Sequence, residues 1–298
     1  MSVPEPVVPF RWDLVRGDRL GGMPLCEAAV HKPLRFPELV ACAAKVLARS
    51  GGGPVFFPGR SCDSVRDLLA AALQGTSYEA APRLLPFSVA GGLADLTPRE
   101  VRQWRANTAA HGLTPAAITR TERTVALCDL VSAGRTFEAL YRLLRNWIED
   151  EREPWSVARR KLRFIGIVRR GQTSPNTWRW HQAAAWTREL PASAVVNVSL
   201  ERAVWSYLGD YQPKLTASFT RPRWAEHDAA PDRGEATRRA LHEAERLTAY
   251  ACSREGREDL VSHLVREPAF REPWLRTLVG QLRQTGSAPR PARQASTH

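Results

Sequence analysis

The chain has 298 residues, of which 43% are hydrophobic, so it is long enough for one large α/β domain or a core with an added domain. No apolar run approaches the roughly 18–20 residues that a helix needs to cross a bilayer, so we expect no membrane partner. The formal net charge of +12 favours phosphate-bearing partners, and a nucleotide or polyphosphate is preferred over duplex nucleic acid because the cations are spread along the chain.

Residues 1–35 are rich in proline and have no regular pattern, and we expect them to wrap around the core. Residues 1–10 have no basic region followed by an apolar stretch, so we expect no signal peptide. The five cysteines of the chain are far apart and include no CxxC pair, which is not the pattern of a zinc site or a disulfide framework. We therefore expect a cytoplasmic protein with reduced thiols. A helix is predicted over residues 36–49.

The next segment predicts a strand, a tight turn and a helix. Residues 54–57 are a short apolar strand, residues 58–61 form the turn, and a helix with an apolar face follows. Arg60 can donate two parallel N–H groups to phosphate oxygens, so Gly59, Arg60 and Ser61 are candidates for a phosphate site. The alternative is a plain turn with an arginine that faces solvent.

Residues 83–90 predict a further strand. Pro86 inside it indicates a sheet edge or a bulge, because proline cannot donate a hydrogen bond to the strand ladder. Residues 92–121 are mostly helical. Thr97 and Glu100 form a capping-box pattern, in which each side chain bonds the backbone N–H of the other residue.

Residues 124–136 combine an apolar strand, a turn of small residues and the start of an amphipathic helix. The first N–H groups of a helix have no intrahelical partner and carry partial positive charge, so such a turn can hold a phosphate. A glycine in the turn lets the backbone approach a ligand, two hydroxyl groups add donors, and an arginine adds charge. The turn residues are Ser132, Ala133, Gly134, Arg135 and Thr136.

Asp129 stands between this strand and its turn. A carboxylate at that point can accept hydrogen bonds from sugar hydroxyls, and it can also help to hold Mg²⁺. The alternative for the whole stretch is an ordinary turn between a strand and a helix that binds nothing.

Two more apolar runs, residues 162–168 and 194–198, predict the last strands. Ser199 is predicted to cap a helix directly after the second run. Between the two runs lie Trp178 and Trp180, whose flat rings can stack on a nucleobase. The alternative is that these tryptophans pack as a hydrophobic cap.

The C-terminal third of the chain has a different character. Residues 211–232 are irregular and basic, and from about 233 to 283 the pattern is helical. We expect these helices to form an appendage or a dimerisation element, and a homodimer is therefore considered. The tail after Gly286 is rich in Pro, Ser, Ala and Arg, which predicts disorder.

Five strands that alternate with helices predict an α/β fold with a central parallel sheet of about five strands flanked by helices. Ligands of such sheets bind beyond the carboxyl ends of the strands, where both candidate phosphate turns lie. We expect an α/β domain with its N-terminal wrap over residues 1–210, a helical appendage over 211–284 and a disordered tail over 285–298.

The stretch 124–136 resembles the phosphoribosyl-pyrophosphate loop of type I phosphoribosyltransferases. That loop follows an apolar strand with two acidic residues, two apolar residues, a small or acidic residue and then Thr-Gly-x-Thr. Here Cys128 stands at the first acidic position and Asp129 at the second, and Ala133 stands where threonine is usual. The resemblance covers roughly residues 50–200.

The resemblance implies a phosphoribosyltransferase-like enzyme, which binds phosphoribosyl pyrophosphate or a related nucleotide or sugar phosphate with Mg²⁺. Such an enzyme transfers the ribosyl phosphate to an acceptor, which the sequence does not identify. It would use Asp129 and Arg60 in catalysis, with Asp129 also as the metal ligand. The resemblance assigns the pyrophosphate to Gly59, Arg60 and Ser61, the other phosphate to Ser132, Ala133, Gly134, Arg135 and Thr136, and the base to Trp178 and Trp180.

Two other classes of function compete with this one. The same scaffold could be a non-catalytic regulatory module that binds a nucleotide or RNA, which the cysteine at position 128 favours. A hydrolase is the third hypothesis, but the sequence has no G-x-S-x-G elbow and no H-E-x-x-H helix. Release of pyrophosphate would separate the enzyme from the binding module, and a steep salt dependence of RNA binding would single out the RNA version.

Overall fold

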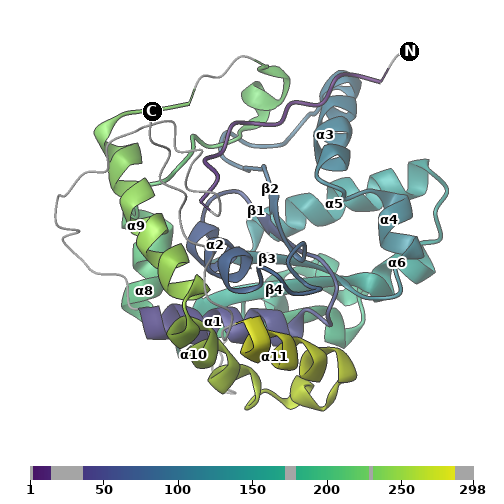
Figure 1. Ribbon diagram of the computed structural model, residues 1–298. Coiled ribbons are helices and arrows are strands. Elements are labelled where there is room, and N and C mark those ends of the chain that lie inside the picture. The colour runs from purple at the N-terminus through teal and green to yellow at the C-terminus, as the bar shows by residue number, and fades with distance from the viewer. Residues whose placement is uncertain (1–2, 15–35, 172–178, 228–230, 286–298) are drawn as a thin grey trace.

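The computed structural model describes residues 3–14, 36–171, 179–227 and 231–285. Its centre is a five-stranded sheet in the order β2-β1-β3-β4-β5, and every pair of neighbouring strands is parallel (Figure 1). The predicted α/β class with a central parallel sheet is therefore confirmed. The strands are β1 (Val55–Pro58), β2 (Pro82–Leu85), β3 (Val125–Leu130), β4 (Leu162–Arg169) and β5 (Val195–Leu200).

The central strands are buried because helices cover both faces of the sheet. In β3 every residue but the last is buried, and in β4 every residue is buried except Arg163 and Arg169. The edge strand β2 is shorter than the predicted strand over residues 83–90. It ends at Leu85, because Pro86 has no N–H with which to continue the ladder.

One face of the sheet carries helices from both ends of the described chain (Figure 1). Helix α9 packs on α2, and α10 packs on α1. Their buried side chains form one core with those of Ala126, Cys128 and Ile165 from the central strands. The helices of this face are α1 (Phe36–Arg49), α2 (Asp63–Ala72), α8 (Arg202–Ser206), α9 (Glu235–Cys252), α10 (Arg254–Leu264) and α11 (Pro273–Thr285).

The opposite face has a second core, in which Leu127 and Phe164 of the sheet meet Phe137 and Leu144 of α5. The segment predicted as mostly helical over 92–121 forms two helices, and the predicted capping box at Thr97 opens the first of them. The remaining helices are α3 (Pro98–Ala110), α4 (Pro115–Arg120), α5 (Arg135–Asp150), α6 (Trp155–Lys161) and α7 (Trp180–Ala183).

The predicted helix start at Ser199 is wrong. Ser199 and Leu200 continue β5, because they pair with the end of β4. Helix α8 begins at Arg202, where the side chain of Glu201 accepts the N–H of Val204 at 3.1 Å. A π-helical turn, Tyr207–Tyr211, follows α8 directly.

The N-terminal segment lies against the core over its described residues 3–14. Val7 and Trp12 are buried, and the N–H of Val7 donates to the side chain of Asn107 in α3 at 2.7 Å. Every helix in the described ranges is too short or too polar to span a bilayer. The tail predicted to be disordered was residues 285–298. Thr285 is the last residue of α11, and residues 286–298 lie outside the described residues.

Candidate functional site

The strand order creates a topological switch point between β1 and β3. After β1 the chain adds β2 on one side of it, and it then returns to add β3 on the other side. Ligands of open α/β sheets bind beyond the carboxyl ends of the two strands that flank such a point. Strands β1 and β3 are paired and parallel, with Val55 opposite Ala126 and Phe56 opposite Leu127. Both candidate phosphate turns therefore lie at the carboxyl ends of these two strands.

The loop after β3 is open to solvent. Ser132, Ala133 and Arg135 are exposed, whereas Gly134 between them is buried. Gly134 has φ 77°, a left-handed conformation that favours glycine, and it stands at the N-cap of α5, where none of the described side chains caps the helix. An added Cβ at Gly134 would lie 2.5 Å from a ring carbon of Trp180. Both the backbone and the packing therefore require glycine at this position.

Asp129 lies beneath this loop and is only 5% exposed. Its carboxylate accepts the N–H of Leu130 at 2.7 Å and a hydrogen bond from the side chain of Thr136. Burial raises the pKa of Asp129 to about 7, although these two hydrogen bonds and the charge of Lys214 act in the opposite direction. The carboxyl group thus changes its charge near neutral pH.

A carboxylate of this kind suits one ligand position of a magnesium ion. In the part of the chain that the structure describes, no group of three or more His, Cys, Asp or Glu side chains is placed to hold a metal. Mg²⁺ normally takes one or two carboxylates and completes its shell with water and substrate phosphates. The residues therefore fit a Mg²⁺ ion that arrives with a phosphorylated ligand, and they do not fit a metal site built from protein groups alone.

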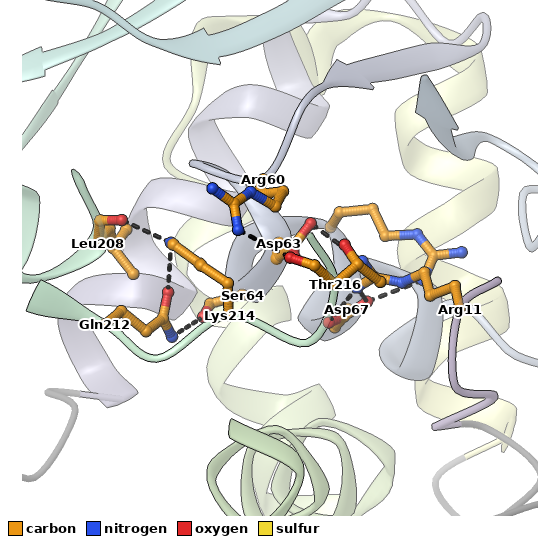
Figure 2. Close-up of polar contacts among 10 residues, drawn as sticks. Arg11, Arg60, Asp63, Ser64, Asp67, Leu208, Gln212, Lys214 and Thr216 are labelled. Atoms are coloured by element: carbon orange, nitrogen blue, oxygen red, sulfur yellow. Dashed lines mark hydrogen bonds and ion pairs between the residues drawn. The ribbon is translucent and has the colours of Figure 1, made fainter. Parts of the chain in front are cut away.

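The turn after β1 is closed rather than open. Gly59 has φ 69°, and an added Cβ there would lie 2.9 Å from the carbonyl oxygen of Phe87. The guanidinium of Arg60 donates to the carbonyl oxygen of Thr216 at 2.7 Å, which fixes it across the end of the strand (Figure 2). Burial lowers the pKa of Arg60. Ser61 is half-buried in the same turn.

The start of α2 carries a buried ionic cluster that the sequence did not reveal. Arg11 donates to both carboxylate oxygens of Asp67 at 2.8 Å and lies 3.1 Å from Asp63 (Figure 2). The three side chains are 10%, 2% and 7% exposed, respectively, so this is a buried ion pair rather than a surface contact. Burial raises the pKa of Asp63, and the positive charge of Arg11 opposes that shift. The cluster fastens the N-terminal segment to α2.

Lys214 is a second residue that the sequence analysis missed. Its ammonium group donates to the carbonyl oxygen of Leu208 at 2.6 Å and to the side chain of Gln212 at 3.0 Å (Figure 2). Burial lowers the pKa of Lys214. The only signal in the sequence is composition, because Lys214 is one of four lysines among the 43 basic residues.

Trp180 lies beneath the loop after β3. It is 9% exposed, its indole N–H donates to Asn197 at 2.7 Å, and its ring packs against Phe137. In this position the ring supports Gly134. Trp178 lies outside the described residues, and base stacking stays a prediction for both tryptophans.

Cys128 points away from the loop. Successive side chains of a strand alternate between its faces, and Cys128 is fully buried in the core between β3 and α2, where it contacts Cys62. Burial raises the pKa of both thiols. Position 128, the first acidic position of the resembled loop, therefore belongs to the core.

A hollow of about 590 Å³ adjoins the open loop. One wall is the exposed side of α5, from Arg135 to Asn146, and the other is the segment after β2. Arg221 holds that segment by donating to the carbonyl oxygen of Ala94 at 2.8 Å and to Glu100 at 2.6 Å. The volume lies within the range of small-molecule sites. Its apolar lining residues are Val89, Leu93, Ala94, Leu96, Val101, Ala139 and Leu143.

A comparison with known proteins found no matching family model, no matching curated protein and no matching solved structure. The class of the protein therefore follows from its own architecture. It is an α/β protein with an open parallel sheet, and its candidate ligand site lies at the switch point between β1 and β3.

Proposed function

We propose that this protein binds phosphoribosyl pyrophosphate, or a related nucleotide or sugar phosphate, at the switch point and transfers the ribosyl phosphate to an acceptor. The observation that carries the proposal is the open loop after β3. It leads through the left-handed Gly134 into an α5 start that none of the described side chains caps, and the buried Asp129 lies directly beneath it. The resemblance of the same residues to a phosphoribosyl-pyrophosphate loop supports it.

The phosphate on the ribose would bind the backbone N–H groups at the start of α5. These donors have no partners within the helix, and the helix dipole favours an anion there. Ser132 and Arg135 are exposed beside them and would add a hydroxyl donor and a positive charge. Asp129, in its ionised form, would accept hydrogen bonds from the ribose hydroxyls.

In the transfer step, the acceptor forms a bond to the anomeric carbon and the bond from that carbon to pyrophosphate breaks. Arg60, together with the turn Gly59 and Ser61, would bind the departing pyrophosphate, which leaves with the electron pair of the broken bond. Mg²⁺ held by Asp129 and the ligand's phosphates would supply further positive charge. The protein's contribution is then positioning and electrostatic stabilisation of an oxocarbenium-like transition state.

The hollow beside the loop is the candidate position of the acceptor. It adjoins Arg135, and its lining is mainly apolar with a few polar side chains. Such a lining suits a ring that has an anionic or hydrogen-bonding substituent.

One observation favours a second candidate, a module that binds the ligand without turnover. The first acidic position of the resembled loop is occupied by Cys128, which lies in the core. The loop therefore has one carboxylate, Asp129, where the resembled loop has two acidic residues. Pyrophosphate release in the presence of a panel of acceptors separates the two candidates, since only the enzyme produces it.

The test is calorimetric titration with phosphoribosyl pyrophosphate, with and without Mg²⁺. We expect Mg²⁺-dependent binding to the wild type and its loss in Asp129→Asn and Gly134→Val. Gly280→Val is the matched control, because an added Cβ at Gly280 in α11 meets no atom within 4 Å. Absence of binding to the wild type would overturn the proposal.

A further inference from the structure

The chain that follows β5 returns to the switch point through an unusual turn. Tyr207–Tyr211 is π-helical, a conformation that is rare and often marks functional sites. The turn lies against the end of β3, since an added Cβ at Gly209 would lie 3.1 Å from the side chain of Leu130. The carbonyl oxygen of Leu208 in this turn accepts the ammonium group of Lys214. The π turn thus positions Lys214 close to the strand that carries Asp129.

Side-chain hydrogen bonds hold the segment around Lys214 across the start of α2. The amide of Gln212 donates to the hydroxyl of Ser64 and to the carboxylate of Glu243, both at 2.7 Å. Two residues after Lys214, the carbonyl oxygen of Thr216 accepts the guanidinium of Arg60 (Figure 2). Lys214 is therefore ordered before any ligand arrives, so a ligand that contacts it would avoid much of the entropy cost of fixing a long side chain.

The surroundings of Lys214 carry charges of both signs. Burial lowers the pKa of Lys214, the charge of Asp63 opposes this shift, and the charge of Arg60 adds to it. Burial likewise lowers the pKa of Arg60, with Asp63 opposing the shift and Arg223 adding to it. Arg60 and Lys214 are thus two cations at the switch point, which an anionic ligand can contact together. An ammonium group has three N–H donors, of which Lys214 uses two on Leu208 and Gln212. Among the residues that the structure describes, no acceptor is found for the third N–H.

We infer that Lys214 is a ligand-contacting cation of the switch-point site, which donates to an oxygen of the pyrophosphate group. The inference rests on the proposed function in naming phosphoribosyl pyrophosphate as the ligand. Inorganic pyrophosphate carries the same chemical group without the ribose, so it tests Lys214 separately.

The first experiment titrates Mg²⁺–pyrophosphate and Mg²⁺–phosphoribosyl pyrophosphate into the wild type and Lys214→Gln. Glutamine keeps a hydrogen-bond donor but removes the charge, and we expect the Kd for both ligands to rise at least tenfold. Lys161→Gln is the control. Lys161 also donates to a backbone carbonyl, that of Glu122, but it directly precedes β4 and so lies at the amino ends of the strands, away from the switch-point site. We expect its Kd to equal that of the wild type.

The second experiment measures the same affinities against pH for the wild type and Lys214→Arg. Lysine loses its proton and its charge as the pH rises, and burial and Arg60 move this loss to lower pH, whereas arginine stays charged. Wild-type affinity should therefore fall at alkaline pH while that of Lys214→Arg persists. The charged or titratable groups that act on Lys214 from the surrounding elements are Arg60, Cys62, Asp63, Asp129 and Glu243.

A third measurement needs no variant. The chain has four lysines, so acetylation by an amine-reactive ester can be followed at each of them by mass spectrometry. We expect pyrophosphate to protect Lys214 while Lys45 and Lys161 react as before. Equal labelling of Lys214 with and without pyrophosphate would overturn the inference.

The failures of the two proposals give different results. If Lys214→Gln binds both ligands as tightly as the wild type, Lys214 has no such role and the proposed function stands. If the wild type binds pyrophosphate but not phosphoribosyl pyrophosphate, and Lys214→Gln weakens that binding, the proposed function fails and the role of Lys214 stands. A wild type that binds neither ligand overturns both.

Discussion

The two strand–turn–helix units at the switch point have the same local pattern and opposite surroundings. Each has a glycine with positive φ in its turn, Gly59 at 69° and Gly134 at 77°. After β1, the protein's own charges fill the start of α2. After β3, the start of α5 is open, with Ser132, Ala133 and Arg135 exposed. Whether a helix start is open to a ligand therefore depends on which side chains from the rest of the chain lie against it.

The start of α2 pairs two carboxylates with two arginines. Asp63, in the first turn, favours the positive end of the helix dipole. Arg11 pairs with both carboxylates from a segment 56 residues away from Asp67, and Arg66 also pairs with Asp67 at 2.8 Å. Removing charges from water is costly, so such a cluster persists only when every member is paired. The unit after β1 therefore contributes mainly to stability, and the proposed site takes Arg60 from it. The loop after β3 is instead exposed at Ser132, Ala133 and Arg135.

The largest expected effect on stability comes from removing Arg11 from the ionic cluster at the start of α2. Arg11→Ala leaves the buried Asp63 without its ion-pair partner and leaves Asp67 only its partly exposed partner Arg66, which should lower the free energy of unfolding by about 3–5 kcal/mol. Chemical denaturation measures this change. Arg142→Ala is the control, because Arg142 pairs with Glu138 on the exposed surface of α5 and should change stability by less than about 0.5 kcal/mol. A loss below about 1 kcal/mol in Arg11→Ala would contradict the assigned role of the cluster.

The next effect concerns the buried carboxylate of the open unit. The pKa of Asp129 in the fold is raised to about 7, so the fold favours the protonated form. The free energy of unfolding of the wild type should therefore fall, relative to Asp129→Asn, as the pH rises from about 4 to about 7, by about 4 kcal/mol in all. Denaturation of both proteins at several pH values measures the difference. A difference that does not depend on pH would show that Asp129 is ionised throughout.

The same titration predicts a pH dependence of binding. The ribose hydroxyls and Mg²⁺ require the ionised carboxylate of Asp129, so affinity for phosphoribosyl pyrophosphate should rise as the pH passes through about 7. Stability and affinity should thus change in opposite directions over one pH range. Affinity that is constant from pH 5 to about pH 8 would separate Asp129 from the ligand.

A smaller effect on stability is expected at the glycine of the open loop. Gly134→Ala places a Cβ on a residue with φ 77° and 2.5 Å from the ring of Trp180, which should cost about 1–2 kcal/mol. Gly280→Ala is its control, since Gly280 lies in helix α11 with open space around it, and alanine there should stabilise by about 0.5–1 kcal/mol. Thermal unfolding of the two variants should therefore shift in opposite directions.

Local patterns predicted the elements that carry the site. The apolar runs over 54–57 and 162–168 correspond to β1 and β4 within one residue at each end, because buried parallel strands are continuously apolar. Both turns were found from their residue types. The far end of the edge strand and the start of α8 were predicted wrongly, because these boundaries depend on which neighbour supplies hydrogen bonds, as Ser199 shows by pairing with β4.

What the sequence could not provide is long-range pairing. The order β2-β1-β3-β4-β5 places the two turns on adjacent strands, and no local pattern encodes that order. Arg11 and Lys214 are separated from the β1 turn by long stretches of chain, so their contacts with Asp63, Asp67 and Leu208 follow only from the fold. The C-terminal helices likewise pack on α1 and α2, a contact between opposite ends of the described chain.

The smallest expected change in stability is at Arg135, which is exposed beside the open loop. Arg135 is exposed at the first position of α5, so Arg135→Gln should leave the free energy of unfolding within about 0.5 kcal/mol of the wild type. Its charge would contact the ligand's phosphate, and a charge-assisted hydrogen bond is worth about 1.5–3 kcal/mol, so affinity for phosphoribosyl pyrophosphate should fall by about tenfold or more. Arg254→Gln is the control, because Arg254 pairs with Glu258 on the exposed surface of α10 and should leave binding as in the wild type. Arg11→Ala would then change stability most and Arg135→Gln would change binding alone, which is the contrast expected if one helix start is filled by the protein and the other is kept for a ligand.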